Sequence, residues 1–172
     1  MWFRNLQIFR LTPDWAYSTD ALTAALQRGI FQGCSASDRL ALGWVPPRGE
    51  EGDLVFSVER QQLIALGIEQ KLLPMSVVRQ YAAAKLEQIA AAQGYKPGRK
   101  QTREVVDQVD AELLPRAFVK RGLTYVWIDP VNRWLLVDAS SSARADEVIE
   151  RECRARRWTN AARRCGSSGA RS

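Results

Sequence analysis

The chain contains no histidine, which narrows the chemistry that its side chains could perform. Without an imidazole, a protein cannot build a Ser-His-Asp or Cys-His nucleophile, an HExxH metal site or a histidine acid–base relay. Cys34 therefore has no histidine to activate its thiol, and we interpret it as inert. Any catalysis would have to use carboxylates, lysines or a metal ion held by oxygen ligands.

One set of residues has the composition needed for such metal chemistry. Asp53 opens an expected strand, and Glu69 and Lys71 form a Glu-x-Lys pattern late in the next strand. This is the pattern of PD-(D/E)xK nucleases, in which two carboxylates hold Mg²⁺ and the lysine helps to activate water. The pattern is short and common by chance, and Leu72-Leu73-Pro74 follows it immediately. On the basis of this pattern, a Mg²⁺-dependent nuclease is kept as an alternative function for the chain.

A second set of residues combines positive charge with an aromatic ring. If the segment around Phe118 is extended, Arg116, Phe118 and Lys120 share one face, because side chains alternate along a strand. The cations could meet phosphates while the ring offers a stacking surface for a nucleic acid. The spacing alone favours the other interpretation, in which Phe118 lies in the core and the cations are solvated.

The net charge of +6 is concentrated at one end of the chain. Seven of the 25 basic residues and one of the 19 acidic residues lie in 151–172, so residues 1–150 hold 18 of each and are neutral. We expect residues 1–150 to form the folded region. We expect residues 151–172 to be a basic segment that is disordered or the product of a frameshift. A basic DNA-binding arm is the alternative interpretation of this segment.

The remaining composition is that of an ordinary globular protein. Hydrophobic residues make up 46% of the 172 residues and charged residues 26%. No apolar run approaches the ~18–20 residues that a membrane-spanning helix needs. Three cysteines without metal-ligand spacing favour the reducing cytoplasm. We therefore expect a cytoplasmic protein with no cofactor and no metal.

Hydrophobic periodicity predicts an α+β fold, with helices packed on a mostly antiparallel sheet, because strands and helices do not alternate regularly. Gly43–Pro47 is interpreted as a loop that its tryptophan anchors against the domain. The expected strands are 2–11, 54–58, 64–69, 116–120, 123–129 and 133–138, and the expected helices begin near residues 18, 74, 106 and 140.

Several short motifs, taken together, resemble the recombination-associated protein RdgC family. Their order and spacing agree with that family from residue 1 to about residue 150. The motifs are Trp2-Phe3-Arg-Asn-Leu, Gly43-Trp-Val-Pro-Pro47, Leu73-Pro74 with Val77-Val78, Leu113-Leu-Pro-Arg-Ala-Phe118, Trp127-Ile-Asp129 and Leu136-Val-Asp138-Ala-Ser.

This resemblance implies a DNA-binding protein that is not an enzyme. Proteins of the family bind double-stranded DNA without sequence preference, associate with the nucleoid and restrain RecA-driven recombination as a homodimer closed into a ring. Arg116 and Phe118 match positions at the ring's interface that affect dimer closure and DNA binding. Lys120 and Arg121 follow the motif and join the candidate DNA-binding residues on charge alone.

The resemblance ends near Glu150, whereas members of the family are larger than a single domain. We therefore expect a truncated member in which DNA binding is impaired. Because residues 1–150 are neutral, few counterions would be released on binding, and the salt dependence would be shallow.

Overall fold

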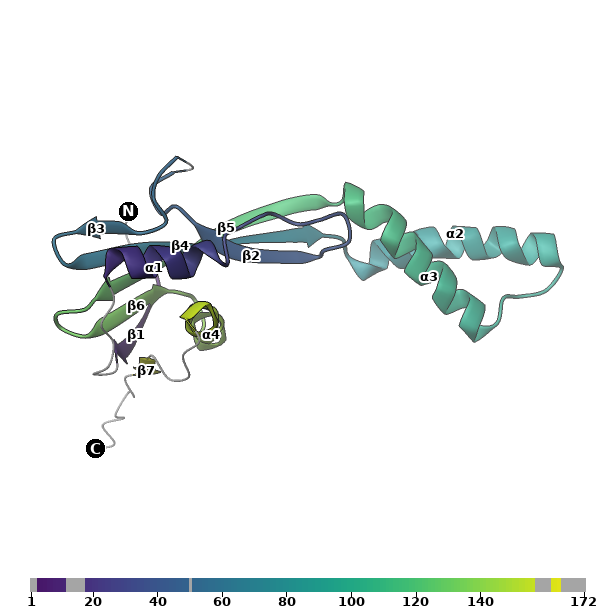
Figure 1. The fold of residues 1–172 in the computed structure, drawn as a ribbon. Coiled ribbons are helices and arrows are strands. Elements are labelled where there is room, and N and C mark those ends of the chain that lie inside the picture. Colours follow the sequence, from purple (N-terminus) through teal and green to yellow (C-terminus); the bar gives the residue numbers. More distant parts are fainter. Residues whose placement is uncertain (1–2, 12–17, 50, 157–161, 165–172) are drawn as a thin grey trace, which may run out of the picture. The chain divides into compact units, whose positions relative to one another are not determined.

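The computed structural model describes residues 3–11, 18–49, 51–156 and 162–164 (Figure 1). The order of strands and helices confirms the α+β class. Side chains are described as far as residue 150. The elements are β1 (Leu6–Leu11), α1 (Thr19–Gln27), β2 (Leu40–Val45), β3 (Phe56–Val58), β4 (Gln61–Leu72), α2 (Met75–Gln93), α3 (Arg99–Leu113), the 3₁₀ turn η1 (Leu114–Arg116), β5 (Phe118–Asp129), β6 (Trp134–Asp138), α4 (Ser142–Arg156) and β7 (Ala162–Arg164).

The strands form one sheet in the order β2-β4-β5-β6-β1-β7, with β3 paired to β4. Strand β6 pairs antiparallel with both β1 and β5, so Leu136 lies between Ile8 and Trp127. Directly opposed residues of antiparallel strands project to the same face. The chain divides into two compact units: the first comprises 1–32, 42–68 and 122–172, and the second comprises 33–41 and 69–121.

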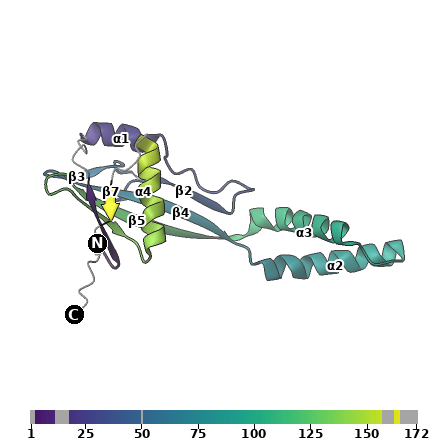
Figure 2. The same ribbon diagram turned by 90° about the horizontal axis from the view of Figure 1, so that it is seen from below.

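The first unit has its core on one face of the sheet. Helices α1 and α4 both cover this face, and their inward residues join one cluster with those of the strands (Figure 2). Helix α1 begins where the Ser18 side chain accepts a hydrogen bond from Ala21 N at 3.2 Å, as its capping pattern predicts. Its inward side chains Leu22 and Leu26 are both fully buried. Burying an aliphatic side chain of this size stabilises the fold by about 1.5–3 kcal/mol.

The opposite face of the sheet carries apolar side chains that stay partly exposed, although the ring of Phe3 packs beside that of Trp127 with the centroids 6.2 Å apart. Leu6 and Ile8 of β1 are 44% and 41% exposed, and Trp127 of β5 is 37% exposed. An open hollow of about 360 Å³ lies here, lined by Ile8, Gln61, Trp127, Asp129, Trp134 and Leu136. Strand β1 is thus apolar on both faces, and its Phe9 and Leu11 are the side chains buried in the core.

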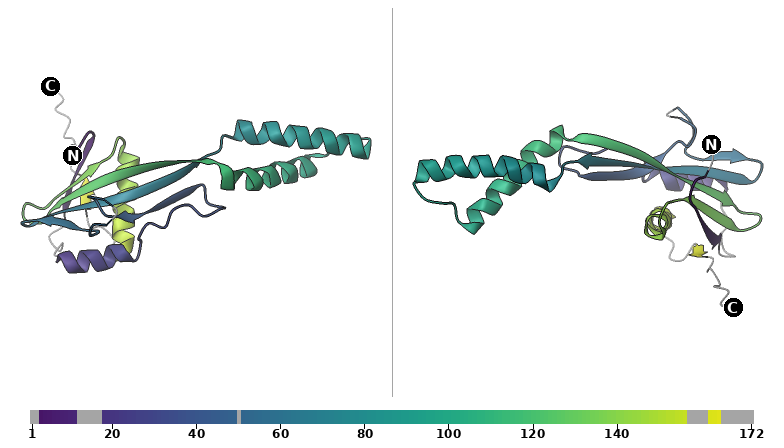
Figure 3. Two further views of the ribbon diagram at one scale, coloured as in Figure 1. Left: turned by 90° about the horizontal axis from the view of Figure 1, so that it is seen from above. Right: turned by 180° about the vertical axis from the view of Figure 1, so that it is seen from behind.

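The second unit has a smaller core between α2 and α3, which lie side by side (Figure 3). Helix α2 begins after Pro74 and ends at Gly94, whose φ of +77° is the left-handed conformation that glycine favours. Val78 of α2 and Val109 of α3 are buried in a cluster of their own. The two helices therefore hold each other through a short apolar seam.

Three sequence-based boundaries are wrong. Gly43-Trp44-Val45 belongs to β2 and not to a loop, because Trp44 is buried and exchanges backbone hydrogen bonds with residues 29 and 31. Residues 116–120 and 123–129 were expected as two strands, but β5 runs continuously from Phe118 to Asp129. Helix α3 begins at Arg99, earlier than its first apolar residue suggests.

The expected basic segment 151–172 is described only in part. Residues 151–156 continue the backbone of α4, and Ala162–Arg164 pairs with β1 as strand β7. The rest of this segment, like Trp2 of the first family motif, lies outside the described residues. The prediction of a disordered or frameshifted segment stays a prediction.

Candidate nucleic-acid interface

The segment predicted to contact nucleic acid lies where α3 gives way to β5. Leu114 is buried and fixes the 3₁₀ turn η1, which Pro115 suits because its φ is locked near the helical value. Arg116 ends this turn, and the backbone becomes extended at Ala117. The prediction that Arg116 belongs to the strand is therefore wrong. Within the strand, only Phe118 and Lys120 share a face by alternation.

Phe118 is 85% exposed, the highest fraction of any large hydrophobic side chain among the described residues. The interpretation in which Phe118 lies in the core is therefore wrong. Its neighbour Val119 is 45% exposed, so both faces of the strand are open at this point. Arg116 and Lys120 are also exposed, and neither makes an ion pair or side-chain hydrogen bond in the described part of the chain. An uncovered ring between two unpaired cations is suited to a polyanion with apolar or stacking surfaces.

Arg121 differs from the other three candidates because it already has a partner. Its Nε donates to the Glu69 Oε2 at 2.8 Å, and the carboxyl side chain is only 6% exposed while the arginine is 75% exposed. Sequence reasoning missed this pair because 52 residues separate the two positions. The exposed part of the guanidinium can still meet a ligand.

The buried Glu69 carboxylate links three segments of the second unit. Oε1 accepts a hydrogen bond from Cys34 N at 2.9 Å. This bond and then the Arg121 contact hold the pKa of Glu69 below its ordinary value. Burial, followed by the negative charge of Glu69, raises the pKa of the Cys34 thiol. A thiol held protonated is a poor nucleophile, which agrees with the interpretation of Cys34 as inert.

The atoms of the nuclease pattern are engaged in protein contacts. Lys71 is buried, and its Nζ donates to the carbonyl oxygens of Ser35 at 2.5 Å and Ala36 at 2.9 Å. Glu69 is paired as described above. Asp53 is exposed, precedes β3 and belongs to the first unit, whereas Glu69 and Lys71 belong to the second. The contacts of Glu69 and Lys71 therefore tether the loop 33–39 to the end of β4.

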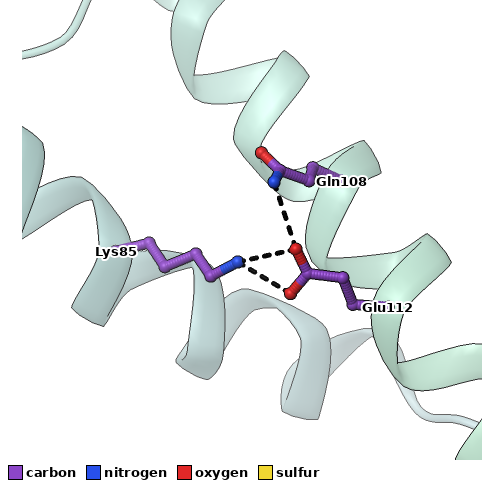
Figure 4. Close-up of polar contacts among 3 residues, drawn as sticks. All are labelled: Lys85, Gln108 and Glu112. Carbon is purple, nitrogen blue, oxygen red and sulfur yellow. Dashed lines mark hydrogen bonds and ion pairs between the residues drawn. The ribbon is translucent and has the colours of Figure 1, made fainter.

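A polar brace joins α2 to α3 just before the candidate residues (Figure 4). Lys85 Nζ contacts both carboxylate oxygens of Glu112, at 3.0 and 2.7 Å, and Gln108 donates to the same carboxylate at 3.1 Å. The Lys85 hydrogen bond lowers the pKa of Glu112, with a small contribution from the charge of Arg116. Arg39 forms a further ion pair with Asp110 of α3. These contacts hold the C-terminal part of α3, which η1 connects to Phe118 at the start of β5.

Sequence reasoning also missed a group of cations at the other end of α3. Residues 94–103, which we name the basic turn, include Lys96, Arg99, Lys100 and Arg103 and no acid. All four side chains are exposed. A local count of charge would have found them, whereas the count over residues 1–150 cancels them against the acids that follow in α3.

No group of three or more cysteine, aspartate or glutamate side chains in the described ranges could hold a metal ion together. No described helix combines the length and apolar character needed to cross a membrane.

Comparisons with known proteins agree with one another. Residues 1–154 match the family described as "Putative exonuclease, RdgC". The chain is 51% identical over 150 residues to the recombination-associated protein RdgC of Janthinobacterium sp. (strain Marseille) and 50% identical over 150 residues to that of Herminiimonas arsenicoxydans. Each match covers 87% of this chain and 50% of the relative. The chain thus spans about half the length of the curated relatives it matches.

Proposed function

Because the chain belongs to the RdgC family, we propose that it binds double-stranded DNA without sequence preference. The residues proposed to make this contact are Arg116, Phe118, Lys120 and the exposed part of Arg121. The observation that carries the proposal is the 85% exposure of Phe118 beside unpaired cations. Phe118 is followed by Val119, which is 45% exposed, and exposed apolar side chains that lie together mark a surface for a partner.

The proposed mechanism is occupancy of the duplex. Cations contact phosphates and the ring packs against the exposed surface of the groove, so no bond is made or broken. A protein bound in this way excludes other proteins from the same duplex. The names of the relatives state only that they are recombination-associated. The proposal therefore also includes restraint of RecA-dependent recombination, association with the nucleoid in the cytoplasm and action as a homodimer.

The test is a salt series of duplex binding measured by fluorescence anisotropy. Phe118→Ala is expected to weaken binding about tenfold, since burying a phenylalanine ring against the groove is worth about 1.5–3 kcal/mol. Lys120→Gln is expected to reduce the slope of log K against log salt by about 0.9. Leu123→Ala is the matched control, because Leu123 lies in the same strand and is 53% exposed.

A further variant separates this site from the basic C-terminal segment. In that variant Arg163, Arg164 and Arg171 are changed to glutamine. The proposed site is refuted if this variant no longer binds duplex DNA while the variants Arg116→Gln, Phe118→Ala and Lys120→Gln still bind it. The C-terminal segment would then carry the binding.

The alternative function is a Mg²⁺-dependent nuclease that uses Asp53, Glu69 and Lys71, and the family description includes the word exonuclease. The contacts of Glu69 and Lys71 favour a structural role for both residues instead. Linear duplex incubated with Mg²⁺ and the full chain tests this. Degradation that stops in Glu69→Gln but continues in Glu112→Gln would establish the nuclease.

A further inference from the structure

The basic turn exposes an aromatic side chain together with its cations. Tyr95 is 65% exposed at the end of α2. Lys96, Arg99, Lys100 and Arg103 make no ion pair or side-chain hydrogen bond within the described residues. The turn therefore presents four exposed positive charges to solvent.

These charges oppose the electrostatics of the helix that carries them. The N-terminus of a helix bears partial positive charge, so acids stabilise the first turn and bases destabilise it. Helix α3 has no acid in its first turn, which contains Arg99 and Lys100. Arg99 and Arg103 also lie four residues apart, where like charges repel. The nearest acids of α3 are Glu104, four residues after Lys100, and Asp107, four residues after Arg103, and neither forms an ion pair with the turn within the described residues. An anion bound at the turn would relieve both effects.

The backbone of the turn is open to such an anion. The N-cap of α3 is Gly98, which offers no side-chain cap, and the first intrahelical bond runs from Thr102 N to Gly98 O at 2.9 Å. The N–H groups of Arg99, Lys100 and Gln101 are therefore not used by the helix. A Cβ placed at Gly94 or Gly98 would meet no heavy atom within 4 Å, so the backbone can be approached closely at both positions.

We propose that the basic turn, residues 94–103, is a second contact for the phosphate backbone of DNA, separate from the Phe118 site. Several exposed cations on a short turn suit a repeating anion better than one isolated phosphate. Tyr95 can donate its hydroxyl proton to a phosphate oxygen, and its ring can pack against a sugar of the backbone. Helix α3 rises about 1.5 Å per residue, so Arg103, the last residue of the turn, lies about 16 Å from η1. The identity of the polyanion rests on the proposed function.

Lysine footprinting tests the two sites independently. The full chain is treated with an acetylating reagent with and without a duplex oligonucleotide, and the modification of each lysine is measured by mass spectrometry. Lys96 and Lys100 report on the basic turn, and Lys120 reports on the Phe118 site. Lys71, which is buried, and Lys85, which is paired with Glu112, are internal references. We expect DNA to protect Lys96 and Lys100 several-fold and to leave Lys71 and Lys85 unchanged.

The pattern of protection separates the two proposals. Protection of Lys120 alone refutes the basic turn and retains the proposed function. Protection of Lys96 and Lys100 alone supports the basic turn and refutes the Phe118 site. No protection at any lysine refutes both. Protection of the basic turn by phosphatidylglycerol vesicles but not by DNA would make it a lipid site and overturn the proposal.

Binding variants provide the second measurement. The double variant Lys96→Gln with Lys100→Gln is expected to reduce the slope of log K against log salt by about 1.8 and to weaken binding about tenfold at low salt. Arg28→Gln with Arg60→Gln is the matched control, because it removes two exposed charges from elsewhere in the chain. Equal effects of the two double variants would show a general charge effect and refute the site. Tyr95→Phe against Tyr95→Ala separates a contact of the hydroxyl from packing of the ring.

Discussion

At the scale of single residues, Gly43 lies against the backbone of the segment that follows α1. A Cβ at this position would stand 2.4 Å from Phe31 Cα and 2.6 Å from Phe31 N. The backbone cannot give way as a flexible side chain could, since Phe31 N donates to Trp44 O at 3.0 Å. The close approach therefore requires glycine at this position of β2.

Gly43→Ala is expected to destabilise the protein by about 3 kcal/mol or more, because overpacking against backbone forces β2 and residue 31 apart. The free energy of unfolding in urea is the measurement. Gly122→Ala is the control, because a Cβ at Gly122 meets nothing within 4 Å. Equal stability of the two variants would show that the strand shifts without cost.

Glu69 gives the stability a dependence on acid. Its pKa is below the ordinary value of 4.5 in the folded protein, because Cys34 N and Arg121 hydrogen-bond to the carboxylate. A depressed carboxyl pKa stabilises the fold above the unfolded-state pKa, and this contribution is lost as the pH falls through the folded-state value. Wild-type stability should thus decline below about pH 4.5, and Glu69→Gln should show a shallower decline. Urea unfolding between about pH 3 and 7 measures it, and parallel curves would contradict the role of Glu69.

The candidate site could be predicted from the sequence only in part. The composition of residues 116–121 identifies a basic segment with one aromatic ring, and this needs no structure. Alternation alone could not decide whether Phe118 is buried, because that depends on what packs against the strand. The engagement of Arg121 by Glu69 also depends on a contact between distant segments, which local spacing does not encode.

At the scale of elements, the end of α2 depends on one backbone conformation. Gly94 has a φ of +77° and its N–H donates to Ala90 O at 2.9 Å. A side chain at this φ brings Cβ close to the carbonyl oxygen, which costs roughly 1–2 kcal/mol. We expect Gly94→Ala to lower the free energy of unfolding by about 1 kcal/mol and Gly94→Asn to lower it less, since asparagine tolerates this conformation. Thermal unfolding followed by circular dichroism checks the order of the two variants.

Helix signals in the sequence were more informative than strand signals. The expected helix starts near residues 18 and 74 depend on signals that act within one turn, and the structure confirms both, with Ser18 and Pro74 at the N-caps of α1 and α2. The extent of β2 and β5 depends on partners far along the chain. Separate strands over 116–120 and 123–129 are expected from the sequence, but β5 runs through residues 121 and 122 between β4 and β6 of the sheet.

At the scale of the whole molecule, two separate cores divide the buried surface. One cluster includes Val137 of β6 with α1 and α4, and the other includes Val109 with α2. A protein with two cores can open one part while the other stays folded. The charge is divided as well. Residues 1–150 have no net charge, because the positive charges of the basic turn are balanced in the sum by acids such as those of α3.

Core substitutions should therefore act locally. Val109→Ala, which costs about 2 kcal/mol through lost burial and a cavity, is expected to speed hydrogen exchange in α2 and α3 more than in β6. Val137→Ala should do the reverse. Mass spectrometry of deuterium uptake measures both. Equal acceleration in all elements would show a single cooperative unit.

Trp127, on the partly exposed face of the sheet, can serve as an intrinsic fluorescence reporter. The chain has six tryptophans, and the three whose side chains are described lie in different surroundings. Trp44 is 2% exposed, Trp127 is 37% exposed, and Trp134 lies 4.2 Å beneath the guanidinium of Arg10. Iodide in solution should thus quench the emission of Trp127 while Trp44 continues to emit in the blue. Any molecule that settles on this face would shield Trp127, so its arrival could be followed by fluorescence without attaching a dye.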